Sequence, residues 1–296
     1  VSGELGLSQP TSVIGASNNQ TLQFLALAQR LGKDLVAEYE WNRLVKAYIF
    51  STTAAYTKTG TTVAGSAVIT SMSNTTSLAA QQVVSGTGIA PYAQILTVDS
   101  PSQVTLDTPC TSAGSGTTLT FAIQDYALPA DFDRMISDTQ WDRTDHWRNI
   151  GPKTSQEFQT LQGGVISVGP RERYRLYNNA LRIFPALTTV FNFSLEYVSN
   201  YWVIASGGSA GTKNTFTLDI DTSVFHDNLM LSGLKMYFLK AKKLDYGAEL
   251  AEFSSILSQR KATDEPVAAT SLAPIQYEPL VGPWSVSDGN WPTTSS

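Results

Sequence analysis

Hydrophobic residues recur at helical spacing near both ends of the chain. Near the N-terminus, a capping-box pattern at Ser17 precedes the apolar positions Leu22, Leu25, Ala26 and Leu31. Gly32 suits the stop of this helix, and Asp34 can cap a second helical pattern that continues to Phe50. Near the C-terminus, Asp227 and Asp245 begin two further helical patterns, over residues 229–243 and up to Arg260. Each end is therefore predicted to form a helical hairpin.

Between residues 58 and 122 the pattern changes to short alternating runs, and charged residues almost vanish. Turn residues separate the candidate strands, which cover residues 67–70, 82–85, 94–99, 103–107 and 117–122. We interpret this segment as a small all-β module inserted into a loop of the host fold, because closure entropy grows slowly with loop length. Cys110 lies inside it without a neighbouring histidine or a cysteine motif, so an idle thiol is expected.

The segment 126–161 mixes aromatic residues with charges of both signs. Asp131 or Asp133 can cap a short helix that points Phe132, Met135 and Ile136 inward. Trp141 and Trp147 then bracket five polar residues, and Thr154 with Glu157 forms a second capping box. Strands follow at residues 165–168, 174–177, 181–184 and 191–198, with Asn178–Asn179 as a tight turn.

These patterns predict an α+β fold: N-terminal and C-terminal helical hairpins with an antiparallel β-sheet core, an inserted all-β module and an extended C-terminal arm. The predicted boundaries are residues 1–57, 58–122, 123–262 and 263–296. Residues 263–296 contain five prolines and cannot be helical in bulk. They also carry large apolar residues that suit docking on another chain, or packing back on their own domain: Ile275, Tyr277, Leu280, Trp284 and Trp291.

Composition narrows the function classes. Charged residues make up 15% of the chain and the formal net charge is −5, with no long run of lysine or arginine, which argues against a protein dedicated to gripping DNA. One cysteine rules out an intrachain disulfide framework. The chain has no apolar run that would span a bilayer and no basic-then-apolar N-terminal pattern. Assembly in a cytoplasm is expected.

Candidate catalytic groups are few. His146 lies near Asp142 and Asp145, but a metal site needs three or four convergent ligands and no second histidine is local. His226 stands at a helix start, and no Gly-x-Ser-x-Gly elbow is present. The Gly/Ser-rich stretch 206–212 lacks the Gly-Lys-[Ser/Thr] of a phosphate-binding loop. We therefore expect no enzyme activity and no cofactor or metal.

Several strings resemble the head-to-tail adaptor (connector) proteins of short-tailed bacteriophages: Leu128-Pro129-Ala130-Asp131-Phe132-Asp133-Arg134, Trp141-Asp142-Arg143, Gly151-Pro152, Ser155-Gln156-Glu157-Phe158 and Lys242-Lys243-Leu244-Asp245-Tyr246-Gly247. The resemblance is weak over residues 58–122 and past Lys261. It implies a virion protein that forms a homo-oligomeric ring, dodecameric in the family, at the portal vertex between capsid and tail. Such a ring binds the portal protein, extends the DNA ejection channel without sequence-specific DNA binding, and gives tail nozzle, tube or fibre proteins an attachment platform.

Ring closure needs a head-to-tail interface between protomers. Aromatic residues and arginine are enriched in interfaces, so we assign this role to Trp141, Asp142, Arg143, Trp147 and Arg148. The arm residues named above are assigned to portal docking. Two alternatives remain open: a carbohydrate- or capsid-binding structural module, and a polysaccharide hydrolase that uses the acids beside the two tryptophans.

Overall fold

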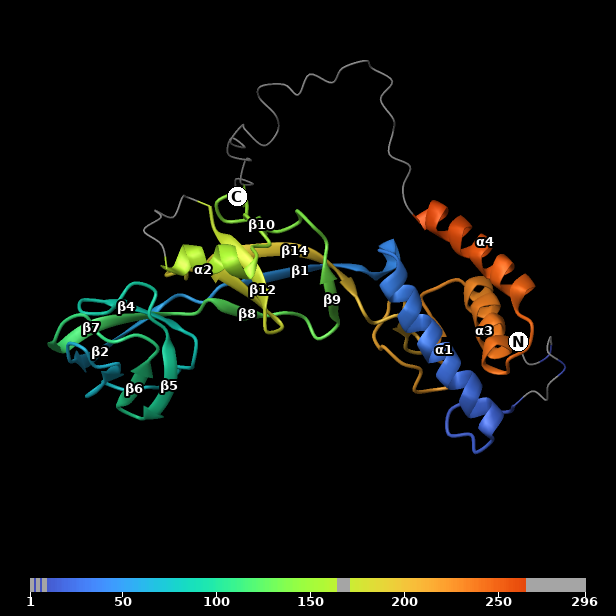
Figure 1. Cartoon of the computed structure of the whole chain (residues 1–296), viewed down its shortest axis with the longest axis horizontal. Coiled ribbons are helices and arrows are strands. Elements are labelled where there is room, and N and C mark those ends of the chain that lie inside the picture. Colours follow the sequence, from blue (N-terminus) through green and yellow to red (C-terminus); the bar gives the residue numbers. More distant parts are fainter. Residues whose placement is uncertain (1–2, 4–5, 7–9, 164–170, 265–296) are drawn as a thin grey trace, which may run out of the picture.

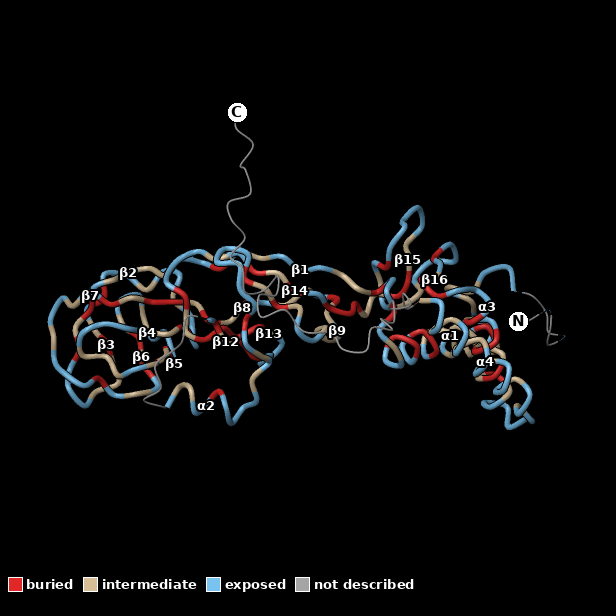
Figure 2. The backbone as a smooth tube through the Cα atoms, turned by 90° about the horizontal axis from the view of Figure 1, so that it is seen from above, coloured by how far each residue is buried: buried red, intermediate tan, exposed pale blue. Residues whose placement is uncertain are grey.

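The computed structural model describes residues 3, 6, 10–163 and 171–264. The molecule is elongated, with a β-rich end, a central β region and a helical end in a row (Figure 1). The described residues form sixteen strands and four α-helices, and the named strands pair antiparallel. Three separate clusters of buried hydrophobic residues accompany these three regions, and buried segments are spread along the whole molecule (Figure 2).

Six strands build the β-rich end: β2 (Tyr56–Thr62), β3 (Val68–Ile69), β4 (Val83–Gly86), β5 (Ile95–Ser100), β6 (Gln103–Leu106) and β7 (Gly114–Ala122). They form two three-stranded sheets, β2-β7-β4 and β3-β6-β5. The five strands expected from the alternating pattern are confirmed, whereas β2 was not expected. Its sequence is mostly threonine, lysine and glycine, and Gly60 lets Ile69 approach its backbone. The Cys110 thiol is buried in the core between these strands.

The central region contains two sheets and helix α2 (Ser155–Gly163). The larger sheet consists of β1 (Val45–Ser51), β9 (Phe132–Met135), β10 (Trp141–Asp142), β11 (Trp147–Arg148) and β14 (Asn192–Ser199). Strand β14 pairs with β1, β9 and β10 and so organises this sheet. The smaller sheet has the order β12-β13-β8 and consists of β8 (Asp125–Ala127), β12 (Arg173–Tyr177) and β13 (Ala180–Phe184).

At the helical end, α1 (Asn19–Glu38), α3 (Asp227–Ala241) and α4 (Gly247–Asp264) pack in a row, beside the short pair β15 (Val203–Ile204) and β16 (Thr222–Ser223). Trp202 is fully buried in this cluster against Gly32 of α1. A Cβ at Gly233 of α3 would lie 2.8 Å from Leu31 and 2.9 Å from Phe253, so a glycine lets the three helices approach one another.

The predicted fold class is wrong, because the chain is mainly β and does not consist of two helical hairpins around a sheet. Among the described residues before β1 there is one α-helix, α1. It continues through Gly32 and Asp34, and the expected second helix is instead a 3-10 turn (Asn42–Leu44) followed by β1. Pairing with β14 along seven residues of β1 overrides the helical spacing of its apolar residues.

The prediction of a short helix at Phe132 is also wrong. Residues Phe132–Met135 form β9, which pairs with β14. Helices α3 and α4 do follow one another at the C-terminal end, and α4 extends to Asp264. The capping box at Thr154, the strands at 174–177, 181–184 and 191–198, and the turn at Asn178–Asn179 are confirmed. The expected strand 165–168 lies outside the described residues.

Candidate functional site

The segment with the predicted interface residues forms a small hairpin on the central sheet. Trp141 pairs with Arg148 and Asp142 pairs with Trp147, and β10 pairs in turn with β14. The Asp142 carboxylate accepts a hydrogen bond from the Thr144 backbone N–H at 2.7 Å, an Asx turn that closes the loop. The Arg143 N–H donates to the Asn192 carbonyl at 2.7 Å, which fastens the loop to β14.

The predicted interface residues differ in their exposure. Arg143 and Arg148 are exposed, Trp147 is 39% exposed and Trp141 is half-buried. Asp142 is fully buried inside the chain. The guanidinium of Arg148 lies 3.2 Å from the Asp138 carboxylate, which is an ion pair within the segment. Arg143, Trp147 and Arg148 are therefore open to a neighbouring molecule, whereas Asp142 serves the hairpin itself.

A pocket of about 480 Å³ opens beside the hairpin, and its lining is aromatic and charged: Asp138, Trp141, His146, Trp147, Arg148 and Arg171. His146 adopts a positive φ of 59°, which turns the chain into β11. The pocket thus gathers both tryptophans of the predicted interface and a mixed set of charges around one hollow.

Beneath the loop, three carboxylates converge. Oxygens of Asp142, Asp145 and Glu172 all lie within 4.8 Å of one another, and Asp142 and Glu172 are buried. Burial raises the pKa of the Asp142 carboxyl, and the nearby Asp145 charge raises it further against hydrogen bonds from the loop backbone. Burial likewise raises the pKa of Glu172, with added repulsion from Asp142 and Asp145. In the described part of the chain, this group is the one that could hold a metal ion.

Sequence reasoning noticed Asp142 and Asp145 but missed Glu172. Glu172 reaches the hairpin because the Ile150 N–H donates to the Glu172 carbonyl at 2.9 Å, and the Tyr174 N–H donates to the Ile150 carbonyl at 3.1 Å. This isolated parallel bridge joins segments that no local pattern connects. The one available signal was the pairing of an acid with arginines in Arg171-Glu172-Arg173, directly before a strand.

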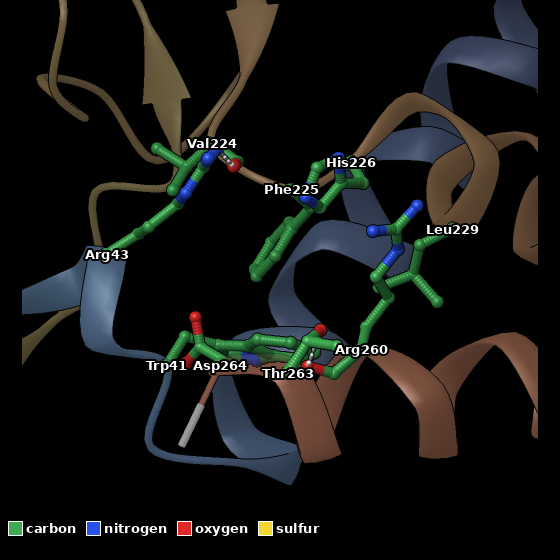
Figure 3. Close-up of a pocket in the computed structure, with 9 residues that line it drawn as sticks. All are labelled: Trp41, Arg43, Val224, Phe225, His226, Leu229, Arg260, Thr263 and Asp264. Atoms are coloured by element: carbon green, nitrogen blue, oxygen red, sulfur yellow. Dashed lines mark hydrogen bonds between the residues drawn. The ribbon is translucent and has the colours of Figure 1, made fainter. Parts of the chain in front are cut away.

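A second pocket, of about 300 Å³, lies at the helical end where α4 finishes (Figure 3). Arg43 and Val224 stand on one side of it, and Trp41, Thr263 and Asp264 line the other (Figure 3). The Asp264 carboxylate accepts the Asn42 N–H at 2.7 Å, which ties the end of α4 to the 3-10 turn. The predicted portal-docking residues Ile275, Tyr277, Leu280, Trp284 and Trp291 lie beyond this point, outside the described residues.

The sequence matches no protein-family model, and comparison with curated proteins finds no match either. None of the helices in the described part of the chain has both the length and the hydropathy that a membrane span requires.

Proposed function

We propose that this chain is a structural subunit of a phage particle: a ring-forming head-to-tail adaptor that binds the portal, extends the DNA channel and carries the tail. The single observation that supports this most is the elongated molecule with three small cores in a row (Figure 1). Such a shape leaves a large surface for each core, and lateral packing of copies around a ring would cover much of it.

Exposed apolar side chains on the central region support the same proposal. Ile49 on the edge strand β1 is 56% exposed, and Trp147, Leu176 and Tyr177 are also open. A solitary exposed hydrophobic residue needs no explanation, but several on the two sheets of the central region fit a surface that meets another subunit. The net charge of −5 suits a channel through which DNA slides, because few phosphate contacts would hold the duplex.

The test is assembly with the portal. The chain is mixed with the portal protein of its own phage, and the products are examined by sedimentation velocity and negative-stain electron microscopy. We expect rings with a central hole seated on portals. A chain that stays monomeric and never joins the portal, at concentrations near those inside an infected cell, would refute the adaptor function.

A pair of variants tests the predicted interface. Trp147→Glu places a charge on the hairpin and should prevent ring closure, since burying an unpaired charge is costly. Leu96→Glu is the matched control, because Leu96 is 57% exposed and lies in β5 at the far β-rich end. Rings from Trp147→Glu that match wild type would show that the hairpin is no protomer contact, even if the adaptor function holds.

A further inference from the structure

The carboxylates beneath the hairpin come from three segments that the fold holds in fixed positions. Asp142 is in β10, Asp145 is in the loop, and Glu172 directly precedes β12. The Asx turn at Thr144 and the Ile150–Glu172 backbone bond set their separation, and one oxygen from each lies within 4.8 Å of the others. Two oxygens that share a calcium ion at about 2.4 Å each can be at most about 4.8 Å apart. The spacing therefore fits a common ion.

The charges of this cluster are not balanced by basic residues in the described part of the chain. Over the described ranges, none of the three carboxylates forms an ion pair with a lysine or an arginine. Arg148, the arginine in β11, is engaged with Asp138 instead. Grouped buried carboxylates are costly unless a cation compensates them.

Unpartnered polar atoms on the same face give a second, independent observation. The Asn149 N–H donates to the Gln140 carbonyl, so the alternation of the hairpin puts Gln140, Asp142 and Asn149 on one face. These three side chains are at most 3% exposed. Oδ2 of Asp142 has no hydrogen-bond partner. The same is true of the oxygen and the nitrogen of the side-chain amide in both Gln140 and Asn149. Buried polar atoms are normally satisfied, and a bound ion with its water is one of the few ways to satisfy this group.

We propose that Asp142, Asp145 and Glu172 bind one calcium ion, with the buried amide oxygen of Asn149 as a neutral ligand. All these donors are hard oxygens, which select calcium or magnesium over zinc or copper. Calcium accepts the irregular geometry of a loop and two strand ends, whereas magnesium demands a near-ideal octahedron. The ion ties the hairpin to the start of β12. The inference does not depend on the adaptor function.

The experiment uses the full chain, freed of metal with a chelator. Calcium binding is measured by titration calorimetry, with magnesium in a parallel titration. Terbium serves as a luminescent stand-in, since Trp141 precedes Asp142, Trp147 pairs with it across the hairpin, and both can sensitise terbium emission. We expect one saturable calcium site per chain, terbium emission on tryptophan excitation, and loss of that emission when calcium is added.

Asp145→Asn is the principal variant, because Asp145 is exposed and the asparagine that replaces it leaves the core intact. It should weaken calcium binding by at least about tenfold, since affinity follows the charge of the ligand set. Glu172→Gln should do the same. Asp133→Asn is the matched control: Asp133 is an exposed acid in β9 of the same sheet, outside the cluster, and its partner is Arg134 and not a residue of the hairpin.

No saturable binding of calcium up to about 10 mM, about tenfold above the weak end of protein calcium sites, would overturn the proposal. Equal affinity of wild type and Asp145→Asn would overturn it as well. Binding of magnesium alone would overturn the choice of ion. If Asp142→Asn fails to fold, the exposed Asp145 variant still decides the question.

Discussion

The ammonium of Lys46 lies 2.6 Å from a carboxylate oxygen of Asp131, across the central sheet. Asp131 also accepts hydrogen bonds from the Tyr197 hydroxyl at 2.8 Å and the Ser199 hydroxyl at 2.7 Å. One nearly buried acid therefore links β1, β14 and the segment that leads into β9. Burial raises the pKa of Asp131, but Lys46 and the two hydroxyl donors outweigh it and bring the pKa below the usual value.

Asp131→Asn should destabilise the fold by about 1–3 kcal/mol at neutral pH, because it removes the charge that Lys46 faces. The folded-state pKa of Asp131 is lower than the unfolded one, so the carboxylate contributes its full stability only above about pH 5. That contribution is lost as pH falls through the folded pKa. The gap between wild type and variant in urea denaturation should therefore shrink between about pH 5 and pH 3.

Asp133→Asn is the control for this experiment. Asp133 lies 2.7 Å from Arg134, but its side chain is 38% exposed, and solvent-exposed pairs contribute little. Its denaturation curves should follow wild type at every pH. A gap for Asp131→Asn that stays constant down to about pH 3 would contradict the assigned pKa direction.

Gly32→Ala tests the contact between α1 and Trp202. The added methyl group would overlap the buried indole ring, and overpacking of a core costs about 1–3 kcal/mol. Alanine is otherwise the better helix former, so the sign of the change reports the contact and not helix propensity. Gly163→Ala in α2 is the matched control, because nothing lies within 4 Å of its added Cβ. Thermal unfolding should show a lower midpoint for the first variant only.

Gly32 also shows where sequence reasoning fails. A glycine after an apolar helical run predicts a stop, yet here its missing side chain makes room for a tryptophan that is distant in sequence. The helix predicted over residues 45–51 was wrong for a similar reason. Their apolar spacing fits a helix, but their pairing partner, β14, lies far along the chain. Two local signals were read correctly, the capping box at Thr154 and the two asparagines with positive φ at 178 and 179. The capping box at Ser17 was not, because Asn18 caps α1. The sequence indicated part of the acid cluster, because Asp142 and Asp145 are close in the sequence, whereas Glu172 is distant from them.

Arg182→Lys tests the contact between the β-rich end and the central region. The Arg182 guanidinium donates two hydrogen bonds of 2.6 Å to Asp125 and another to the Gln81 side chain, next to β4. Lysine cannot reproduce this fork, and the position is nearly buried, so we expect a loss of about 2 kcal/mol in urea denaturation. Arg143→Lys, at an exposed position, should leave stability unchanged. Equal curves for both variants would show that the fork contributes nothing.

The β-rich end should open independently of the rest of the molecule. Its core shares no residue with the other two clusters, and Cys110 is buried within it. All six tryptophans lie outside residues 56–122, so thiol labelling reports this end and tryptophan fluorescence reports the remainder. Burial raises the pKa of the Cys110 thiol, which further slows its reaction with a disulfide reagent until this end opens.

Two matched core truncations test this independence. Val84→Ala lies in the β-rich core and Val198→Ala in the helical-end core, and both valines are at most 1% exposed. Each should cost about 2 kcal/mol locally. Val84→Ala should speed Cys110 labelling in dilute urea and leave the tryptophan transition in place, while Val198→Ala should do the reverse. If both variants shift both signals equally, the chain unfolds as one cooperative unit, and the β-rich end owes its stability to the central sheet and not to its own core.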